Sequence, residues 1–367
     1  MGPARPGPPG WPPRGDVMIV LTRARAATVA ALALAVSLAA AVPGQETLDA
    51  QLRTFLRDRL RLTPAQLTAV ERGDAVAVDL PSSVDREIAV AGVVRIDAPA
   101  ERLVALVGDI ERFESGPGFL KTGKISDPPV LADFSALEVP AEDVADLRKC
   151  RPGKCEVKLG QGAFDQLKSI DWTTPDAHAR VTALARQMAL DYVVAYRQGG
   201  NAELAVYRDN TRPTFIAAEF ADMMGRTAQL PETLPGLADY LLEYPKASRP
   251  AGLEEFFYWS LAEFGLKPLV RLNHVVIYPL AGTRTRYAIA TKQLYASHYF
   301  HTALEVRALL DDTARPGHAH YLVVLNVARS DGLTGMFGGI VKSKARSGSR
   351  DGLQRALAAT KRRCEAG

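Results

Sequence analysis

After Pro250 the chain carries four β-rich segments in succession, and one long candidate helix then closes the sequence. The four segments are EEFFYWSLAEF, VRLNHVVIYP, RYAIATKQLYASHYFHTALEVRALL and HYLVVLNVA. Turn-like stretches separate them, so neighbours in sequence are expected to pair antiparallel. The third segment is too long for one ordinary strand, so it either bends strongly at residues 296–298 or forms two strands. This order predicts an antiparallel sheet followed by a helix.

The closing helix is expected from Leu333 to about Arg363, because its apolar residues keep roughly helical spacing. Each glycine in a helix interior costs about 1 kcal/mol relative to alanine. Close approach of the helix backbone to a sheet or a ligand would offset that cost, and a helix broken near residues 347–349 is the alternative. The glycines concerned are Gly335, Gly338, Gly339, Gly348 and Gly352.

The rest of the chain divides by pattern. Residues 44–86 are expected to form a helical preface, in which Thr63 and Gln66 have the spacing of a capping box. Residues 87–140 contain the strand-like EIAVAGVVRI, the helical AERLVALVGDIERF and the short strand candidates LKTGKIS and FSALEV. Residues 141–250 are mainly helical. We therefore predict an α+β domain made of residues 87–140 and 251–366, with a large helical insertion at 141–250.

Residues 1–43 have the parts of a leader that ends in a secretory signal peptide. Arg23 and Arg25 precede the apolar run AATVAALALAVSLAAAV, and either Met1 or Met18 could be the start. This run is short and mostly alanine, which makes a permanent membrane anchor the weaker interpretation. We expect an exported, soluble protein in the periplasm or outside the cell.

The stretch CRPGKC holds two of the three cysteines, Cys150 and Cys155. Pro152 and Gly153 suit the two central positions of a tight turn, which would bring the cysteines opposite each other one step outside it. Four residues between the cysteines are too many for a thioredoxin-like couple, and a zinc site would need further ligands nearby. An exported chain therefore favours a structural disulfide.

Strand, helix pair, antiparallel strands and a long terminal helix follow the order of the helix-grip fold. On that order, and on the segment VVRIDAPAERLVALVGDIERF, the chain resembles the START-like superfamily, which includes lipid-transfer proteins and polyketide cyclases. The resemblance covers residues 87–140 and 251–366; the preface, the insertion and the export signal depart from it. It implies a curved antiparallel sheet that grips the C-terminal helix, with a cavity for an apolar molecule between them.

Several residues on the predicted strands are compatible with such a cavity. Aromatic walls with a few polar groups are typical of small-molecule sites, and an amide inside an apolar strand needs hydrogen-bonding partners. Ordinary core packing is the alternative for each of them. The candidate ligand-binding residues are Tyr258, Trp259, Tyr295, Tyr299 and Asn326.

Catalytic motifs are absent from the sequence: it has no G-x-S-x-G, Walker A, G-x-G-x-x-G after a strand, or H-E-x-x-H. If the protein is an enzyme, acid–base groups along the cavity would carry the chemistry. The weak candidates are His298, His301, Tyr299 and Asp331. His318 and His320 could share a strand face, but no other ligand stands beside them, so no metal and no cofactor are expected.

Three functions remain open. The first is a carrier that holds a lipid or another apolar small molecule, the second a cyclase, dehydratase or hydrolase using the same cavity, and the third an interaction protein with a filled core. The chain has 45 Lys and Arg against 41 Asp and Glu, and outside the leader the balance is 41 against 40, which argues against a nucleic-acid partner. Peripheral contact with a membrane surface through basic residues of the last helix is a further expectation. The oligomeric state is open.

Overall fold

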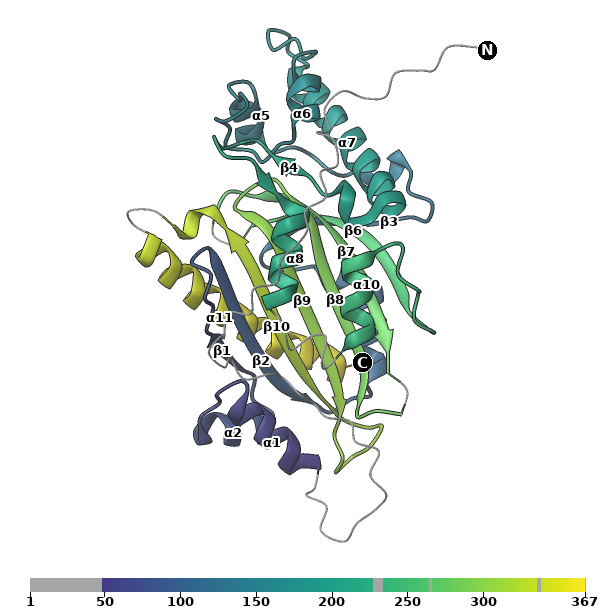
Figure 1. Ribbon diagram of the computed structural model, residues 1–367. Helices are drawn as coiled ribbons and strands as arrows, with labels where there is room; N and C mark the ends of the chain where they lie inside the picture. Colours follow the sequence, from purple (N-terminus) through teal and green to yellow (C-terminus); the bar gives the residue numbers. More distant parts are fainter. Residues whose placement is uncertain (1–47, 227–233, 264–265, 281, 335–337, 367) are drawn as a thin grey trace, which may run out of the picture. The chain divides into compact units, whose positions relative to one another are not determined.

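A sheet of eight strands forms the centre of the computed structural model, which describes residues 48–226, 234–263, 266–280, 282–334 and 338–366 (Figure 1). The predicted leader lies outside these residues. The strand order is β1-β2-β10-β9-β8-β7-β6-β3, and every neighbouring pair is antiparallel. The strands are β1 (Val76–Leu80), β2 (Glu87–Ile96), β3 (Phe119–Ile125), β6 (Glu254–Ala262), β7 (Leu269–Pro279), β8 (Thr285–Ala296), β9 (Phe300–Asp311) and β10 (His320–Ser330).

Helices contact this sheet and fill the central part of the chain, which confirms the predicted α+β class. Thr63 forms the expected capping box with Gln66 at the start of α2. A small separate sheet pairs β4 (Val206–Tyr207) with β5 (Thr214–Phe215). The helices are α1 (Leu48–Asp58), α2 (Pro64–Glu71), α3 (Ala100–Gly108), α4 (Ile110–Phe113), α5 (Ala141–Leu147), α6 (Gln161–Leu167), α7 (Ala177–Gly199), α8 (Ile216–Arg226), α10 (Pro235–Glu243) and α11 (Gly338–Glu365).

The two faces of the sheet carry different helices. On β2, Val90 and Val94 pack in one apolar cluster with Leu353 and Leu357 of α11 and with residues of α3. Val93, whose side chain points to the opposite face, packs with α1 and α2. Further along that opposite face, α7, α8 and α10 cover the strands β6 to β9 (Figure 1). The C-terminal helix and the helices of the central region, residues 141–250, called the insertion below, therefore lie on opposite sides of one sheet.

The close approach between sheet and α11 depends on a glycine of the strand. A Cβ atom on Gly92 of β2 would lie 2.6 Å from Cδ1 of Leu357 and 3.1 Å from the carbonyl oxygen of Val76. The helix glycines behave otherwise, because a Cβ on Gly339, Gly348 or Gly352 would have nothing within 4 Å. The expected break is therefore wrong, because α11 runs unbroken from Gly338 to Glu365, and Gly339, Gly348 and Gly352 do not approach the sheet; Gly335 lies outside the described residues.

A buried arginine joins the insertion to the sheet. Arg329 of β10 is fully buried, and its guanidinium lies 2.9 Å from Glu87 Oε2 of β2. The same group lies 3.1 Å from Glu219 Oε2 and 2.8 Å from Asp222 Oδ2, both on α8. A buried charge of this kind is tolerated only when it is fully paired. This cluster therefore specifies how α8 sits on the sheet.

Three sequence predictions need correction or completion. The long third segment is two strands, β8 and β9, joined through residues 297–299. Residues 76–80, placed in the helical preface, form the edge strand β1. The segment FSALEV is not a strand; instead Arg186 and His178 of α7 hydrogen-bond the carbonyl oxygens of Leu137 and Val139. Side chains of a helix thus replace the strand partner that this segment would need.

Candidate ligand-binding cavity

An apolar cavity of about 310 Å³ lies between the insertion and the end of the sheet. Its wall comes from α5, α6, α7, the extended segment 157–160, and strands β7 and β8. Most of the lining residues are aliphatic; the exceptions are Gly160, Tyr192 and Tyr295, together with three small or charged polar residues, Asp143, Lys158 and Ser297. Concave apolar spaces with a few convergent polar groups are the usual form of small-molecule sites.

One stripe of α7 builds much of the wall. The lining positions lie three or four residues apart, the spacing that places side chains on one helix face. Ala185 and Ala189 occupy places in this stripe where larger side chains would fill the space. The stripe consists of Val181, Leu184, Ala185, Met188, Ala189 and Tyr192.

The cavity is on the face of the sheet opposite the C-terminal helix. The resemblance implied a cavity between sheet and α11, yet no residue of α11 lines either of the two cavities described here. On the α11 side, Val275, Ile277 and Leu309 of the sheet are buried in one cluster with Leu353 and Leu357. The larger of these two cavities is thus lined by the insertion, by residues 137 and 139, and by β7 and β8, and not by α11.

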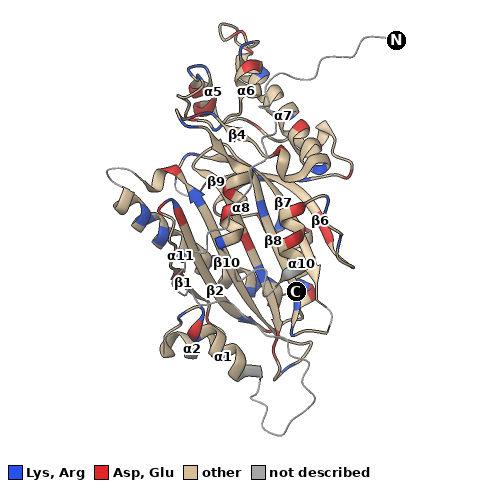
Figure 2. Cartoon of the chain, viewed as in Figure 1, with Lys and Arg blue, Asp and Glu red and all other residues tan. Residues whose placement is uncertain are grey.

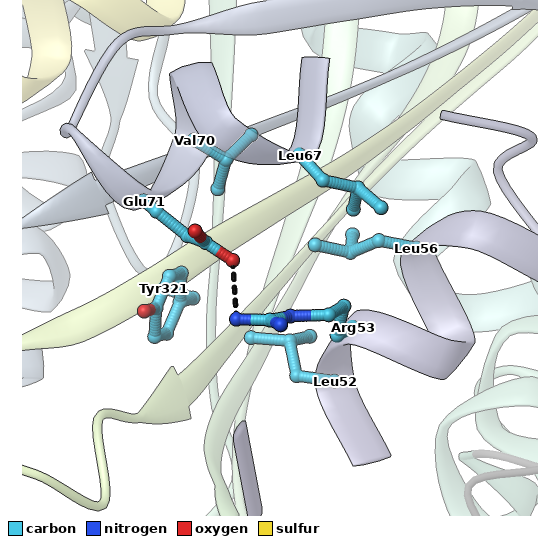
Figure 3. A pocket seen from close by; sticks show the side chains of 7 residues that line it. All are labelled: Leu52, Arg53, Leu56, Leu67, Val70, Glu71 and Tyr321. Atoms are coloured by element: carbon cyan, nitrogen blue, oxygen red, sulfur yellow. Dashed lines mark ion pairs between the residues drawn. The ribbon is translucent and has the colours of Figure 1, made fainter. Parts of the chain in front are cut away.

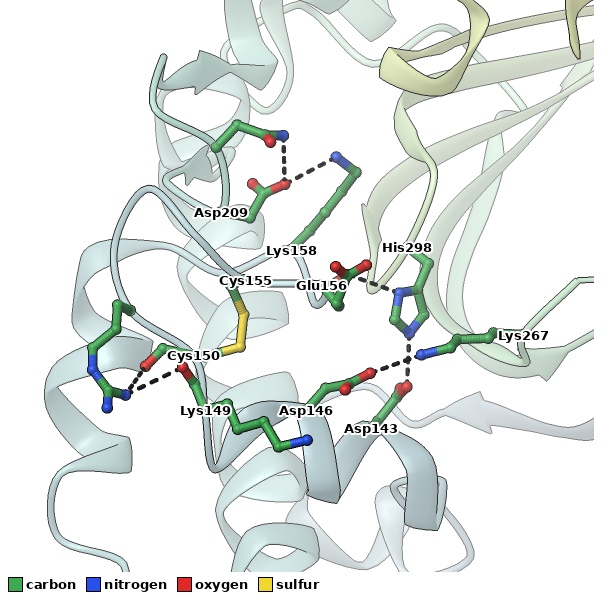
Figure 4. The surroundings of a disulfide bond; sticks show 12 residues. Asp143, Asp146, Lys149, Cys150, Cys155, Glu156, Lys158, Asp209, Lys267 and His298 are labelled. Carbon is green, nitrogen blue, oxygen red and sulfur yellow. Dashed lines mark hydrogen bonds and ion pairs between the residues drawn. A yellow bond between two sulfur atoms is a disulfide. The ribbon is translucent and has the colours of Figure 1, made fainter. Parts of the chain in front are cut away.

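Two buried residues, Asp143 and His298, form a pair at the polar end of the cavity (Figure 4). Nε2 of His298 lies 2.8 Å from Oδ1 of Asp143, and Nδ1 lies 3.0 Å from the carbonyl oxygen of Glu156. A carbonyl oxygen only accepts, so Nδ1 carries a hydrogen. The second contact also needs a proton, held either by Nε2 or by the carboxyl group. The pair therefore has no net charge in either arrangement, and neither imidazole nitrogen is left to act on a ligand.

Lys158 stands next to this pair and is also held by carboxylates. Its Nζ lies 3.4 Å from Asp209 Oδ2 and 3.5 Å from Asp331 Oδ2. Asp331 in turn lies 2.6 Å from Nε2 of His301. Burial raises the pKa of Asp331, but His301 and Lys158 outweigh it, so the pKa lies below its ordinary value. His301 and Asp331, two of the weak catalytic candidates, thus pair with each other beside Lys158, and neither lines the cavity.

The disulfide confirms the prediction made from CRPGKC and lies beside the cavity (Figure 4). Arg151 and Lys154 close the turn, with Gly153 at φ 84° in the left-handed region. Cys150 follows the lining residue Leu147, and Cys155 precedes the lining residue Val157. Both half-cystines pack against the apolar cluster of this wall. The bond therefore ties the end of α5 to the segment that carries Lys158.

Of the five predicted ligand-binding residues, only Tyr295 lines this cavity, and its hydroxyl donates to the carbonyl oxygen of Lys158 at 2.9 Å. The other four lie away from it. Tyr258 donates to Glu114 on the α11 side, and Trp259 donates to the carbonyl oxygen of Asp133. The hydroxyl of Tyr299 accepts from the backbone N–H of Lys267, and Asn326 donates to Glu305 on the neighbouring strand. Each of these four has a partner within the protein.

A second buried network of polar side chains was not predicted from the sequence. Nζ of Lys292 donates to the hydroxyl of Tyr196 at 3.1 Å, and that hydroxyl lies 3.4 Å from Nδ1 of His274. Nε2 of His274 lies 2.8 Å from Glu255 Oε2. Burial lowers the pKa of Lys292 and of His274. Lys292 also donates to Asn201 and lies 4.0 Å from the ring centre of Phe220, so its polar group is fully surrounded. The lysine in the apolar strand AIATKQLYA was the signal for it.

A smaller cavity of about 60 Å³ lies between α1 and α2, over Tyr321 (Figure 3). An exposed ion pair of Arg53 with Glu71, 2.6 Å long, spans it. Such exposed pairs contribute little to stability. A space of this size suits ordered water rather than an organic ligand.

Comparison with known proteins gives no match to a family model and no significant match to a curated protein. Within the described ranges, no three His, Cys, Asp or Glu side chains are grouped so that they could hold a metal ion. None of the described helices is both long and apolar enough to cross a membrane.

Proposed function

We propose that this protein is a carrier that binds a lipid or another apolar small molecule in the cavity under the insertion. The observation that carries the proposal is the aliphatic cavity itself, at about 310 Å³. That volume is at the lower end of the range for small-ligand sites, about 300–1,000 Å³. A cavity with such a wall does not hold water well and gains free energy when an apolar molecule fills it.

The fold supports the carrier proposal at the level of architecture. An antiparallel sheet packs on a long C-terminal helix, as the START-like resemblance implies, and we propose that the chain is a distant relative of that superfamily. In this proposal the insertion has taken over the ligand space from the sheet–helix interface. The disulfide is typical of oxidising compartments and supports export.

Filling the cavity tests the proposal. In Ala185→Phe, a ring on the α7 stripe enters the cavity and should weaken binding of the neutral dye N-phenyl-1-naphthylamine by at least about tenfold, a loss of about 1.4 kcal/mol. Ala183→Phe is the matched control, because Ala183 is exposed on the same helix and does not line the cavity. Equal dye affinity in the two variants would contradict the assignment. Native mass spectrometry after gentle purification should show an apolar ligand that Ala185→Phe lacks.

A second candidate is an enzyme that acts on an apolar substrate in the same cavity. Asp143 favours it, because this carboxyl group lines the cavity and shares a proton with His298. Since both imidazole nitrogens are engaged, Asp143 would be the group that exchanges a proton with substrate. Products formed from hydrophobic esters and alcohols, followed by liquid chromatography and mass spectrometry, should disappear in Asp143→Asn. Turnover that survives this substitution would exclude the role.

Peripheral contact with an anionic membrane surface is proposed for the first half of α11. Ile340 and Val341 are 62% and 42% exposed there, and Lys342, Lys344 and Arg346 follow them. Figure 2 shows basic residues along this part of the helix. Basic residues near an anionic bilayer contribute about 1 kcal/mol each. Co-sedimentation with phosphatidylglycerol vesicles but not with phosphatidylcholine vesicles is the expected result, and equal binding to both would refute it.

A further inference from the structure

We infer that the ligand is a neutral amphiphile: an apolar chain or ring system with one uncharged hydrogen-bonding group, such as a hydroxyl. This inference rests on the proposed carrier function and adds the chemical class of the ligand. The evidence is the way in which the charges at the polar end of the cavity are already matched within the protein.

The polar end offers the carboxylate of Asp143, the ammonium of Lys158 and the hydroxyl of Ser297, while the hydroxyl of Tyr295 donates to the carbonyl oxygen of Lys158. Asp143 is 2% exposed, and its Oδ1 is engaged by His298. Lys158 is 4% exposed and lies between Asp209 and Asp331. The hydroxyl of Ser297 accepts a hydrogen bond from the backbone N–H of Val270 at 3.0 Å. No unpaired positive charge remains among these lining groups.

A charged head group of either sign would find no free partner at this end. Lys158 is shared by Asp209 and Asp331, Asp331 also pairs with His301, and Asp143 pairs with His298, so each charged group already has an opposite partner. Taking a carboxylate out of water into an apolar space costs several kcal/mol unless a cation pairs with it. With Lys158 committed and His298 neutralised by Asp143, nothing on the wall meets that cost. A fatty acid anion is therefore a poor ligand, and an alkylammonium ion is a poor ligand for the matching reason, because the carboxylates here are already paired.

A neutral hydroxyl finds complementary partners at the same place. The hydroxyl of Ser297 still has a hydrogen to donate, and Oδ2 of Asp143 can accept one. Ser297 precedes His298, the partner of Asp143, and its carbonyl oxygen accepts from the backbone N–H of Lys158 at 2.8 Å. The donor and the acceptor therefore belong to one small group of residues. A ligand hydroxyl can use both without bringing any charge into the cavity.

Three ligands of equal chain length test the inference: dodecanol, dodecanoate and dodecylammonium. Each is titrated below its micelle concentration against the full chain loaded with N-phenyl-1-naphthylamine at neutral pH. Dodecanol should displace the dye with an affinity at least about tenfold higher than either ion, which corresponds to about 1.4 kcal/mol. If either ion binds as tightly as dodecanol or more tightly, the inference is overturned while the carrier proposal stands. If neither the dye nor any of the three binds, the carrier proposal itself fails.

A pair of isosteric variants locates the effect. Asp143→Asn keeps an oxygen that accepts from Nε2–H of His298 but removes the carboxylate that neutralises the imidazole, so dodecanoate should gain affinity relative to dodecanol by several-fold or more. Asp146→Asn is the control, because Asp146 lies on the same helix, pairs with Lys267 and does not line the cavity (Figure 4). Its ratio of alcohol to acid affinity should equal that of the unchanged protein. An unchanged ratio in Asp143→Asn would refute the electrostatic argument.

Discussion

Glycines on the two sides of the contact between β2 and α11 should respond in opposite directions to alanine. Gly348 lies inside α11, and an added Cβ there would have nothing within 4 Å. Because the helix conformation is unchanged and the unfolded chain loses freedom, Gly348→Ala should raise the free energy of unfolding by about 0.5–1 kcal/mol. Gly352 has the same open surroundings, so the double variant should gain about 1–2 kcal/mol.

Gly92→Ala is the counterpart on the strand. Its Cβ would lie 2.6 Å from Cδ1 of Leu357, 3.2 Å from Cδ2 of Leu353 and 3.1 Å from the carbonyl oxygen of Val76. The first two atoms can shift with their side chains, but the carbonyl oxygen belongs to the paired strand β1. Overpacking of this kind costs about 1–3 kcal/mol, so this variant should lose stability.

Urea unfolding followed by circular dichroism measures both effects. The slope of free energy against urea should stay constant, so that a change of midpoint reports stability alone. A higher midpoint for Gly348→Ala and a lower one for Gly92→Ala are expected. If Gly92→Ala is as stable as the unchanged protein, α11 does not pack on β2 as described. If Gly348→Ala is less stable than the unchanged protein, the side chain at position 348 of α11 does not point into open space as described.

Three further substitutions test the buried groups. The double variant Cys150→Ser, Cys155→Ser should lose about 2 kcal/mol, the value for a loop this short, and should no longer respond to dithiothreitol in urea unfolding. Arg329→Met leaves Glu87 and Glu219 without their buried partner and should lose about 3–5 kcal/mol; an unchanged midpoint would contradict the paired-charge account. Burial lowers the pKa of Lys292, so between this lowered pKa and the ordinary lysine pKa the unfolded chain binds more protons and stability rises with pH. Relative to the unchanged protein, Lys292→Met should therefore be most stable at low pH, and a pH-independent difference would refute this.

Local signals in the sequence predicted local structure well. The strand-like apolar run EIAVAGVVRI predicted β2, the Thr63 capping box predicted the start of α2, and Pro152-Gly153 predicted the turn that closes the disulfide. In each case the residues that decide the conformation lie within a few positions of one another. FSALEV failed because its backbone partners come from α7, and nothing in six residues indicates a helix as the partner.

The candidate site could be predicted only in pieces. His298, His301, Asp331 and Tyr295 were all singled out, and the structure brings them to one end of the cavity. Asp143, which completes the pair with His298, is 155 positions away in sequence and stands in an ordinary acidic helix start. Its role depends on how the insertion folds back onto the sheet, which a single sequence does not encode in any local pattern.

Side-chain size, and not the order of helices and strands, decides on which side of the sheet the larger cavity lies. Toward α11 the sheet presents branched residues such as Val275, Ile289 and Leu309, which are buried in one apolar cluster with residues of α3 and α11, and Gly92 lets α11 lie close to β2. Toward the insertion, α7 presents alanines at 185 and 189 to the cavity, and residues 157–160, which follow the disulfide, form another part of its wall. The small residue Gly92 on the strand lets α11 approach the sheet closely. The small residues Ala185 and Ala189 lie on the helix α7, and because the backbone of α7 is fixed by other contacts, they leave a cavity. The same substitution of alanine by phenylalanine that would disrupt a filled core should therefore be accepted at position 185, at the expense of the ligand.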